Sequence, residues 1–106
     1  MKSEIIATSP RSAAKKLARR LRQEAKAIGA SPTNIFVWSP KETKSRGWGS
    51  GWAVCWEEGP FEWALNLAGG GSIYNLHTGT TAVKVIDQAN YYCEPYNGFI
   101  LNFYPN

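Results

Sequence analysis

The sequence is poor in the residues that build metal centres, disulfide scaffolds and membrane spans. Its two cysteines, Cys55 and Cys93, lack the short spacing of a metal or redox motif, and His77 is its single histidine. No apolar run approaches the roughly 20 residues of a membrane-spanning helix. The N-terminus turns basic where a signal peptide would be apolar. We therefore expect no metal, no cofactor, no membrane partner and a cytoplasmic location in which both cysteines stay reduced.

Charge is unevenly distributed along the 106 residues, a length that predicts one domain. Residues 1–48 hold eleven Lys or Arg against three Glu, whereas residues 49–106 hold one Lys against four Glu and one Asp. The basic half is expected to bind anions. The acidic half is one candidate partner for it, either in the same molecule or in a second copy.

The pattern of apolar residues and turn formers predicts a fold of the α+β class. We expect one N-terminal helix over residues 10–28, which begins at Ser9-Pro10 and ends at Gly29. Strands are expected over residues 4–9, 34–38, 52–57, 61–67, 72–76 and 81–86 and in a final hairpin over 91–104 with Asn97-Gly98 at its tip. The helix should pack on a mainly antiparallel β-sheet, giving a two-layer single domain over residues 1–106 with a mobile basic loop at 39–51.

Apolar residues at every second position over residues 52–67 predict a hairpin whose core-facing side is aromatic. Trp52, Val54, Trp56 and Trp63 share that face, while Glu57 and Glu62 project away from it. In the register with a two-residue loop the two carboxylates lie opposite each other, which calls for a neighbouring cation. The alternative is a solvated acidic patch at the end of a hairpin.

The expected helix carries two stripes of different chemistry. The apolar stripe, which should face the sheet, consists of Ala14, Leu17, Ala18, Leu21, Ala25 and Ile28. Five cations lie beside it and form what we call the basic ridge: Arg11, Lys15, Arg19, Arg22 and Lys26. At 1.5 Å per residue this ridge is about 22 Å long. It suits contacts to phosphates or to an acidic protein surface, or it is an ordinary solvated helix face.

Two further segments add candidate binding residues. The 39–51 loop contributes Lys44 and Arg46 beside Trp48, and an exposed Trp among cations is typical of surfaces that stack on bases. The final hairpin is apolar on both faces, so it is either central in the sheet or lies at an interface, which leaves a homo-oligomer open. Glu94 shares the aromatic face in the expected register. If it is buried there, it needs an Arg or several N–H donors, which makes it a candidate binding carboxylate.

The blocks "VCWEEGPFEWAL" and "EPYNGFILNFYP" resemble stretches of small uncharacterised phage and prophage proteins. The resemblance implies a short, cofactor-free accessory protein of the anti-defence type, which acts in the host cytoplasm. Such proteins plug a nucleic-acid-binding complex or sequester a nucleotide signal. The resemblance assigns no role to any individual residue.

The sequence therefore predicts a non-enzymatic binding protein, an inhibitor or sequestering module that engages an anionic target through the basic ridge and the 39–51 loop. The expected partner is a host defence protein, a nucleoprotein complex or a nucleotide. The alternative is a nucleic-acid-binding protein that contacts phosphates with the same residues. A third and more distant hypothesis is a small hydrolase or thiol enzyme around His77.

Overall fold

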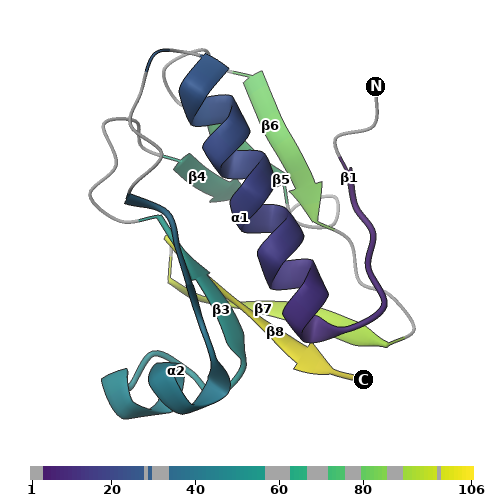
Figure 1. The fold of residues 1–106 in the computed structure, drawn as a ribbon, viewed down its shortest axis with the longest axis vertical. Helices are drawn as coiled ribbons and strands as arrows, with labels where there is room; N and C mark the ends of the chain where they lie inside the picture. Colours follow the sequence, from purple (N-terminus) through teal and green to yellow (C-terminus); the bar gives the residue numbers. More distant parts are fainter. Residues whose placement is uncertain are drawn as a thin grey trace.

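One long helix lies across two four-stranded sheets (Figure 1). In the first sheet the strand order is β1 (Glu4–Ile5), β6 (Thr80–Val85), β5 (Ser72–Asn75) and β4 (Trp63–Asn66). In the second it is β2 (Phe36–Trp38), β3 (Trp52–Cys55), β8 (Ile100–Pro105) and β7 (Tyr91–Asn97). The helices are α1 (Pro10–Ala27) and α2 (Pro40–Arg46). This computed structural model describes residues 4–27, 29, 34–56, 63–66, 72–75, 80–85, 90–97 and 99–106.

The predicted α+β fold is confirmed, with an N-terminal helix on mainly antiparallel strands. Every described strand pair is antiparallel except β1 with β6, which is parallel. Among the described segments, neither helix is long and apolar enough to cross a bilayer. The strands are divided between two sheets, whereas alternation along the chain had predicted a single one.

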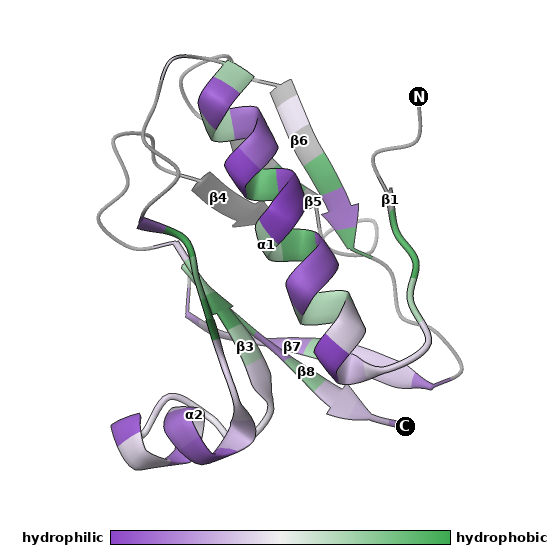
Figure 2. Cartoon of the chain, viewed as in Figure 1, coloured by the Kyte–Doolittle hydropathy of each residue, from purple (hydrophilic) through white to green (hydrophobic). Residues whose placement is uncertain are grey.

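A single core joins both sheets to α1. The helix contacts β1 and β6 of the first sheet and β2, β3 and β8 of the second. Its buried side is the predicted apolar stripe as far as the described residues extend, with one addition: Ala13, Ala14, Leu17, Ala18, Leu21 and Ala25. Tyr91 of β7 is fully buried, and its hydroxyl donates a 3.2 Å hydrogen bond to the carbonyl of Ile5 in β1. Figure 2 shows hydrophilic residues alternating with hydrophobic ones along α1.

The predicted hairpin between residues 52–57 and 61–67 is wrong. β3 pairs with β2 on one side and with β8 on the other, so both of its edges are occupied, while β4 pairs with β5. The predicted face of β3 is nevertheless confirmed, because Val54 and Trp56 are buried in the main core and Trp52 packs against it. Glu57 and Glu62 lie outside the described residues.

The final hairpin is confirmed, but its register differs by one residue from the expected one. Asn97 pairs with Ile100, and the ladder shifts between Pro95 and Asn97. The side-chain oxygen of Asn97 accepts a 2.9 Å hydrogen bond from the Phe99 N–H, and Pro95 has no N–H to give to the ladder. Cys93 therefore pairs with Phe103 and joins the main core, whereas Tyr92 pairs with Tyr104 on the other face.

The outer face of the second sheet has a small core of its own, which explains why the last hairpin is apolar on both sides. Ala53, Cys55 and Ile100 are buried there beneath Trp38 and Trp48. Cys55 thus lies on the opposite face of the sheet from Cys93, and no disulfide joins them.

Residues 40–46 form the short helix α2, so the prediction of an irregular loop is wrong for this segment. Ser39 and Glu42 build a reciprocal capping box: the Glu42 N–H donates to Ser39 Oγ at 3.3 Å, and the Ser39 N–H donates to Glu42 Oε1 at 2.9 Å. The hydrogen bond from the Ser39 N–H to the Glu42 carboxylate, followed by one from the Ser39 side chain, lowers the pKa of Glu42, because both favour its charged form. Gly47 ends the helix with φ of 73°, a left-handed conformation that glycine adopts without strain.

Replacing Ser39 with alanine should lower the free energy of unfolding by about 1 kcal/mol, the usual cost of removing an N-cap side chain. Urea denaturation followed by circular dichroism measures this change. Ser39→Asp is the matched variant, because aspartate also accepts from the helix N–H groups and should restore most of the loss. Equal destabilisation by both variants would contradict the capping role.

Candidate anion-binding groove

The basic ridge lies where α1 meets the edge of the second sheet. The helix starts at Ser9, whose Oγ accepts a 3.1 Å hydrogen bond from the Ser12 N–H. Burial of Leu17 and Leu21 then fixes the rotation of α1 about its axis. Because the ridge borders the apolar stripe, this rotation turns the cations toward β2, an edge strand of the second sheet.

A groove of about 670 Å³ separates α1 from β2. Its helix wall is made of four ridge cations and one glutamine: Lys15, Arg19, Arg22, Gln23 and Lys26. Its strand wall is Phe36 and Val37. The groove is therefore basic on one side and apolar on the other, within the size range of small-ligand sites.

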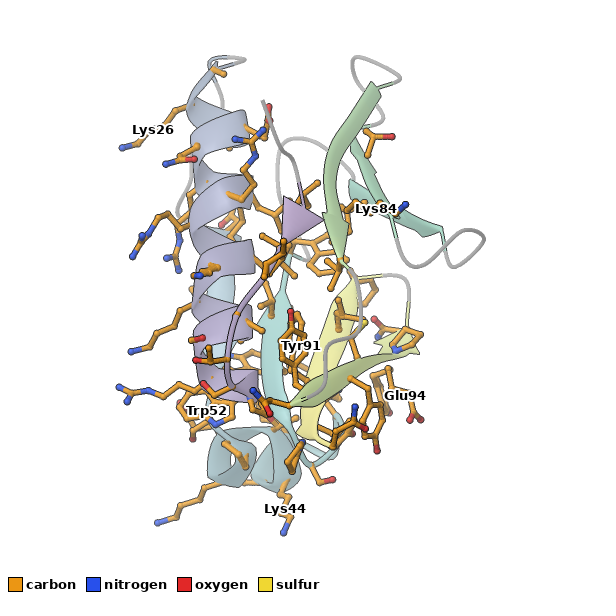
Figure 3. All side chains as sticks on the ribbon, turned by 90° about the vertical axis from the view of Figure 1, so that its right-hand side faces the viewer. Lys26, Lys44, Trp52, Lys84, Tyr91 and Glu94 are labelled. Carbon is orange, nitrogen blue, oxygen red and sulfur yellow. The ribbon has the colours of Figure 1, made fainter. Side chains whose placement is uncertain are left out.

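Three of the ridge cations remain available to an external anion. Lys15, Arg19 and Lys26 are exposed, and Figure 3 shows Lys26 pointing away from the sheets. Within the part of the chain that the structure describes, the one ion pair joins Arg20 to Glu24 at 3.2 Å, so no ridge residue takes part in one. Like charges four residues apart repel each other, which favours a bound anion over the empty groove.

Two ridge arginines also make contacts within the molecule. Arg22 is half-buried, and its Nη2 donates a 2.7 Å hydrogen bond to the carbonyl of Ile35. Arg11 does not line the groove, and its guanidinium carbon lies 5.8 Å from the ring centroid of Trp52. Arg22 thus ties α1 to the residue that precedes β2, while Arg11 extends the ridge beyond one end of the groove.

The outer edge of β2 presents little of its backbone to the groove. The Trp56 N–H donates to the Phe99 carbonyl, on the β8 side of β3. Successive residues of a strand direct their backbone groups to opposite sides. The backbone groups of Val54 therefore point toward β8, and those of Cys55 and Ala53 point toward β2. Val37, paired with Val54, therefore turns its N–H and C=O out of the sheet and into the groove.

Lys44, Arg46 and Trp48 belong to a separate structure around α2. Trp48 is half-buried rather than exposed, and it stacks on Trp38 with ring centroids 4.5 Å apart. The guanidinium carbon of Arg46 lies 4.5 Å from the Trp38 centroid. These contacts close the small core on the outer face of the sheet. Lys44 is exposed and projects from α2 at the opposite end of the molecule from Lys26 (Figure 3).

Glu94 and His77 are not part of the groove. Glu94 is exposed on β7 and lies on the far side of the molecule from Lys26 (Figure 3). His77 lies outside the described residues. Among the residues that are described, no three His, Cys, Asp or Glu side chains are grouped so that they could hold a metal ion.

Sequence reasoning missed the strand wall of the groove. Phe36 has 47% of its surface exposed, which is unusual for a large aromatic residue in a short strand. Pairing of Phe36 with Cys55 places its ring on the outer face of β2, so the ring lies at the rim of the groove. Alternation in "NIFVW" separates Phe36 from Val37, but only the neighbouring helix shows that both residues border a basic groove.

Comparisons with known proteins assign no family to this chain. A scan against protein-family models found no matching family, and searches of curated proteins and of solved structures found no match.

Proposed function

We propose that this protein is a binding protein without catalytic activity, and that the groove between α1 and β2 takes an anionic partner. One observation carries the proposal: Lys15, Arg19 and Lys26 are exposed along one wall of a groove, and none of them is neutralised by a described carboxylate. Attraction between this wall and an anion speeds association and orients the partner.

We further propose that binding alone is how the protein acts, as an inhibitor or a sequestering module. An anionic target that fills the groove is withheld from other proteins. The resemblance to phage accessory proteins favours this role and a host defence component as the partner. Prolonged incubation should leave a bound polyanion intact, and its cleavage would contradict a role limited to binding.

The test uses a polyanion without bases or side chains, so that it measures charge recognition alone. We expect fluorescently labelled inorganic polyphosphate of about ten units to bind the wild-type protein, with an affinity that falls steeply as salt rises. Lys15→Glu/Arg19→Glu should weaken binding by at least about tenfold. Each reversed charge replaces an attraction with a repulsion worth up to about 1 kcal/mol at an exposed site.

The matched control is Lys41→Glu/Lys44→Glu, which makes the same change in net charge on the exposed surface of α2. It should retain binding within about threefold, because these residues do not line the groove. Equal losses in both double variants would mean that net charge, and not the groove, determines binding. The fold of the first variant should survive, since reversal removes like-charge repulsion along α1.

A further inference from the structure

Phe36 places an exposed aromatic ring at the rim of the groove that the cations of α1 line. Its ring lies on the outer face of β2, Val37 presents its backbone at the strand edge, and the cations of α1 lie beyond. A ligand lying along this edge would meet cations, then a backbone donor and acceptor, then an aromatic face. A nucleotide carries the matching groups: phosphates for the cations, a base edge with hydrogen-bond donors and acceptors, and a base face that can stack on an aromatic ring.

We infer that the groove binds single-stranded nucleic acid, with phosphates on Lys15, Arg19 and Lys26 and a base stacked on Phe36. The inference rests on the proposed anion-binding function and adds the chemical class of the ligand. An aromatic ring beside a row of cations is the arrangement that single-strand-binding proteins use without sequence preference, because every base has a flat π face.

The strand edge argues against an acidic peptide as the occupant. A peptide that adds to a sheet needs a run of unused N–H and C=O groups along the edge. Here the Ile35 carbonyl already accepts from Arg22, and the next outward residue after Val37 is Ser39. The Ser39 N–H donates to Glu42 and its carbonyl accepts from Thr43. Val37 alone is too short a ladder for a peptide strand.

Duplex nucleic acid fits the site less well than a single strand does. Bases in a duplex are stacked on one another, so they cannot cover the ring of Phe36 without being extruded, and extrusion is costly. A duplex could therefore use only the cations of α1. We expect a double-stranded probe to bind more weakly than a single strand of the same length.

The experiment compares decathymidylate with polyphosphate of similar length, using fluorescence anisotropy at two or more salt concentrations. Decathymidylate should bind more tightly, because it adds stacking to the charge contacts. With phosphates on the three exposed cations of the groove, the affinity should fall with a log–log salt slope of about −2, at about −0.7 per phosphate for single strands. A slope near zero would overturn the inference.

Variants of Phe36 separate stacking from charge. Phe36→Leu keeps an apolar side chain on the edge strand. It should lower the affinity for decathymidylate roughly tenfold and change the affinity for polyphosphate by no more than about twofold. Phe36→Trp, with a larger ring, should restore or tighten binding. The matched control is Tyr96→Leu, which removes an aromatic ring that is 52% exposed on β7, away from the groove. It should change neither affinity.

Each contrary result has a distinct meaning. If Phe36→Leu leaves decathymidylate unchanged, or if decaglutamate or a ten-base-pair duplex binds as tightly, the inference of a single-stranded ligand is overturned. The anion-binding function would still stand on the polyphosphate result. If neither polyphosphate nor decathymidylate binds, both the inference and the proposed function fail.

Discussion

Replacing Leu17 with alanine should lower the free energy of unfolding by about 2–5 kcal/mol. Leu17 is fully buried on α1, in the one core that the helix shares with both sheets. Its truncation removes apolar contacts and leaves a cavity where neither sheet can easily close over the gap. A domain of this size has a total stability of roughly 5–15 kcal/mol, so the loss is a large fraction of it.

Urea denaturation monitored by tryptophan fluorescence measures the effect of Leu17→Ala. Gln23→Ala is the matched control on the exposed side of the same helix and should change stability by less than about 0.5 kcal/mol. The result bears on function, because the same packing turns the basic ridge toward β2. A loss below about 1 kcal/mol would contradict the central place of α1 in the core.

Replacing Asn102 with alanine should cost about 2–4 kcal/mol, through a different mechanism. Asn102 is 1% exposed, and its side chain bridges two backbone groups: Oδ1 accepts from the Gly51 N–H at 3.2 Å, and Nδ2 donates to the Trp48 carbonyl at 3.1 Å. Truncation leaves both groups without this partner in a mostly buried setting, at about 1–3 kcal/mol each.

Thermal and urea unfolding of Asn102→Ala test this bridge between β8 and the segment after α2. Ser50→Ala is the control in the same segment, because the Ser50 side chain is exposed and should matter little. The Trp38–Trp48 stack should also loosen in Asn102→Ala, which near-ultraviolet circular dichroism would detect. Unchanged stability would show that Asn102 does not hold this segment to the sheet.

The features that depend on residues close together in the sequence were predictable. The bounds of α1 follow from a capping serine at Ser9 and from Gly29, and its buried side follows from helical periodicity. The strand stretches and the last hairpin follow from alternation and from Asn97-Gly98. Each of these signals acts between neighbouring residues, so no knowledge of the fold was needed.

Strand partners could not be predicted, because alternation fixes the face of a strand and not its neighbour. Val54 needs an apolar face beside it, and both a residue of β4 and Leu101 of β8 satisfy that need equally. The structure selects the long-range partner, since β3 completes a sheet with β2, β8 and β7. The one-residue shift in the last hairpin likewise depends on the Asn97 side chain and on Pro95.

The helix wall of the groove was predictable and the strand wall was not. The ridge follows from the spacing of five cations on one helix, whereas Phe36 and Val37 become part of the site only through packing. The signal for α2 was present in "SPKE", where Ser39 and Glu42 have capping-box spacing. The glycines and charged residues of this segment favoured an irregular loop in the prediction. In the structure, burial of Thr43 and stacking of Trp48 stabilise the segment.

The central claim, that the groove between α1 and β2 is the anion-binding surface, is tested most directly by NMR. Polyphosphate is titrated into uniformly ¹⁵N-labelled protein, and the shift of each backbone amide is followed. We predict that the largest changes fall on residues 15–26 and on Phe36 and Val37. Changes centred on α2 or on β7, or no changes at all, would contradict the claim.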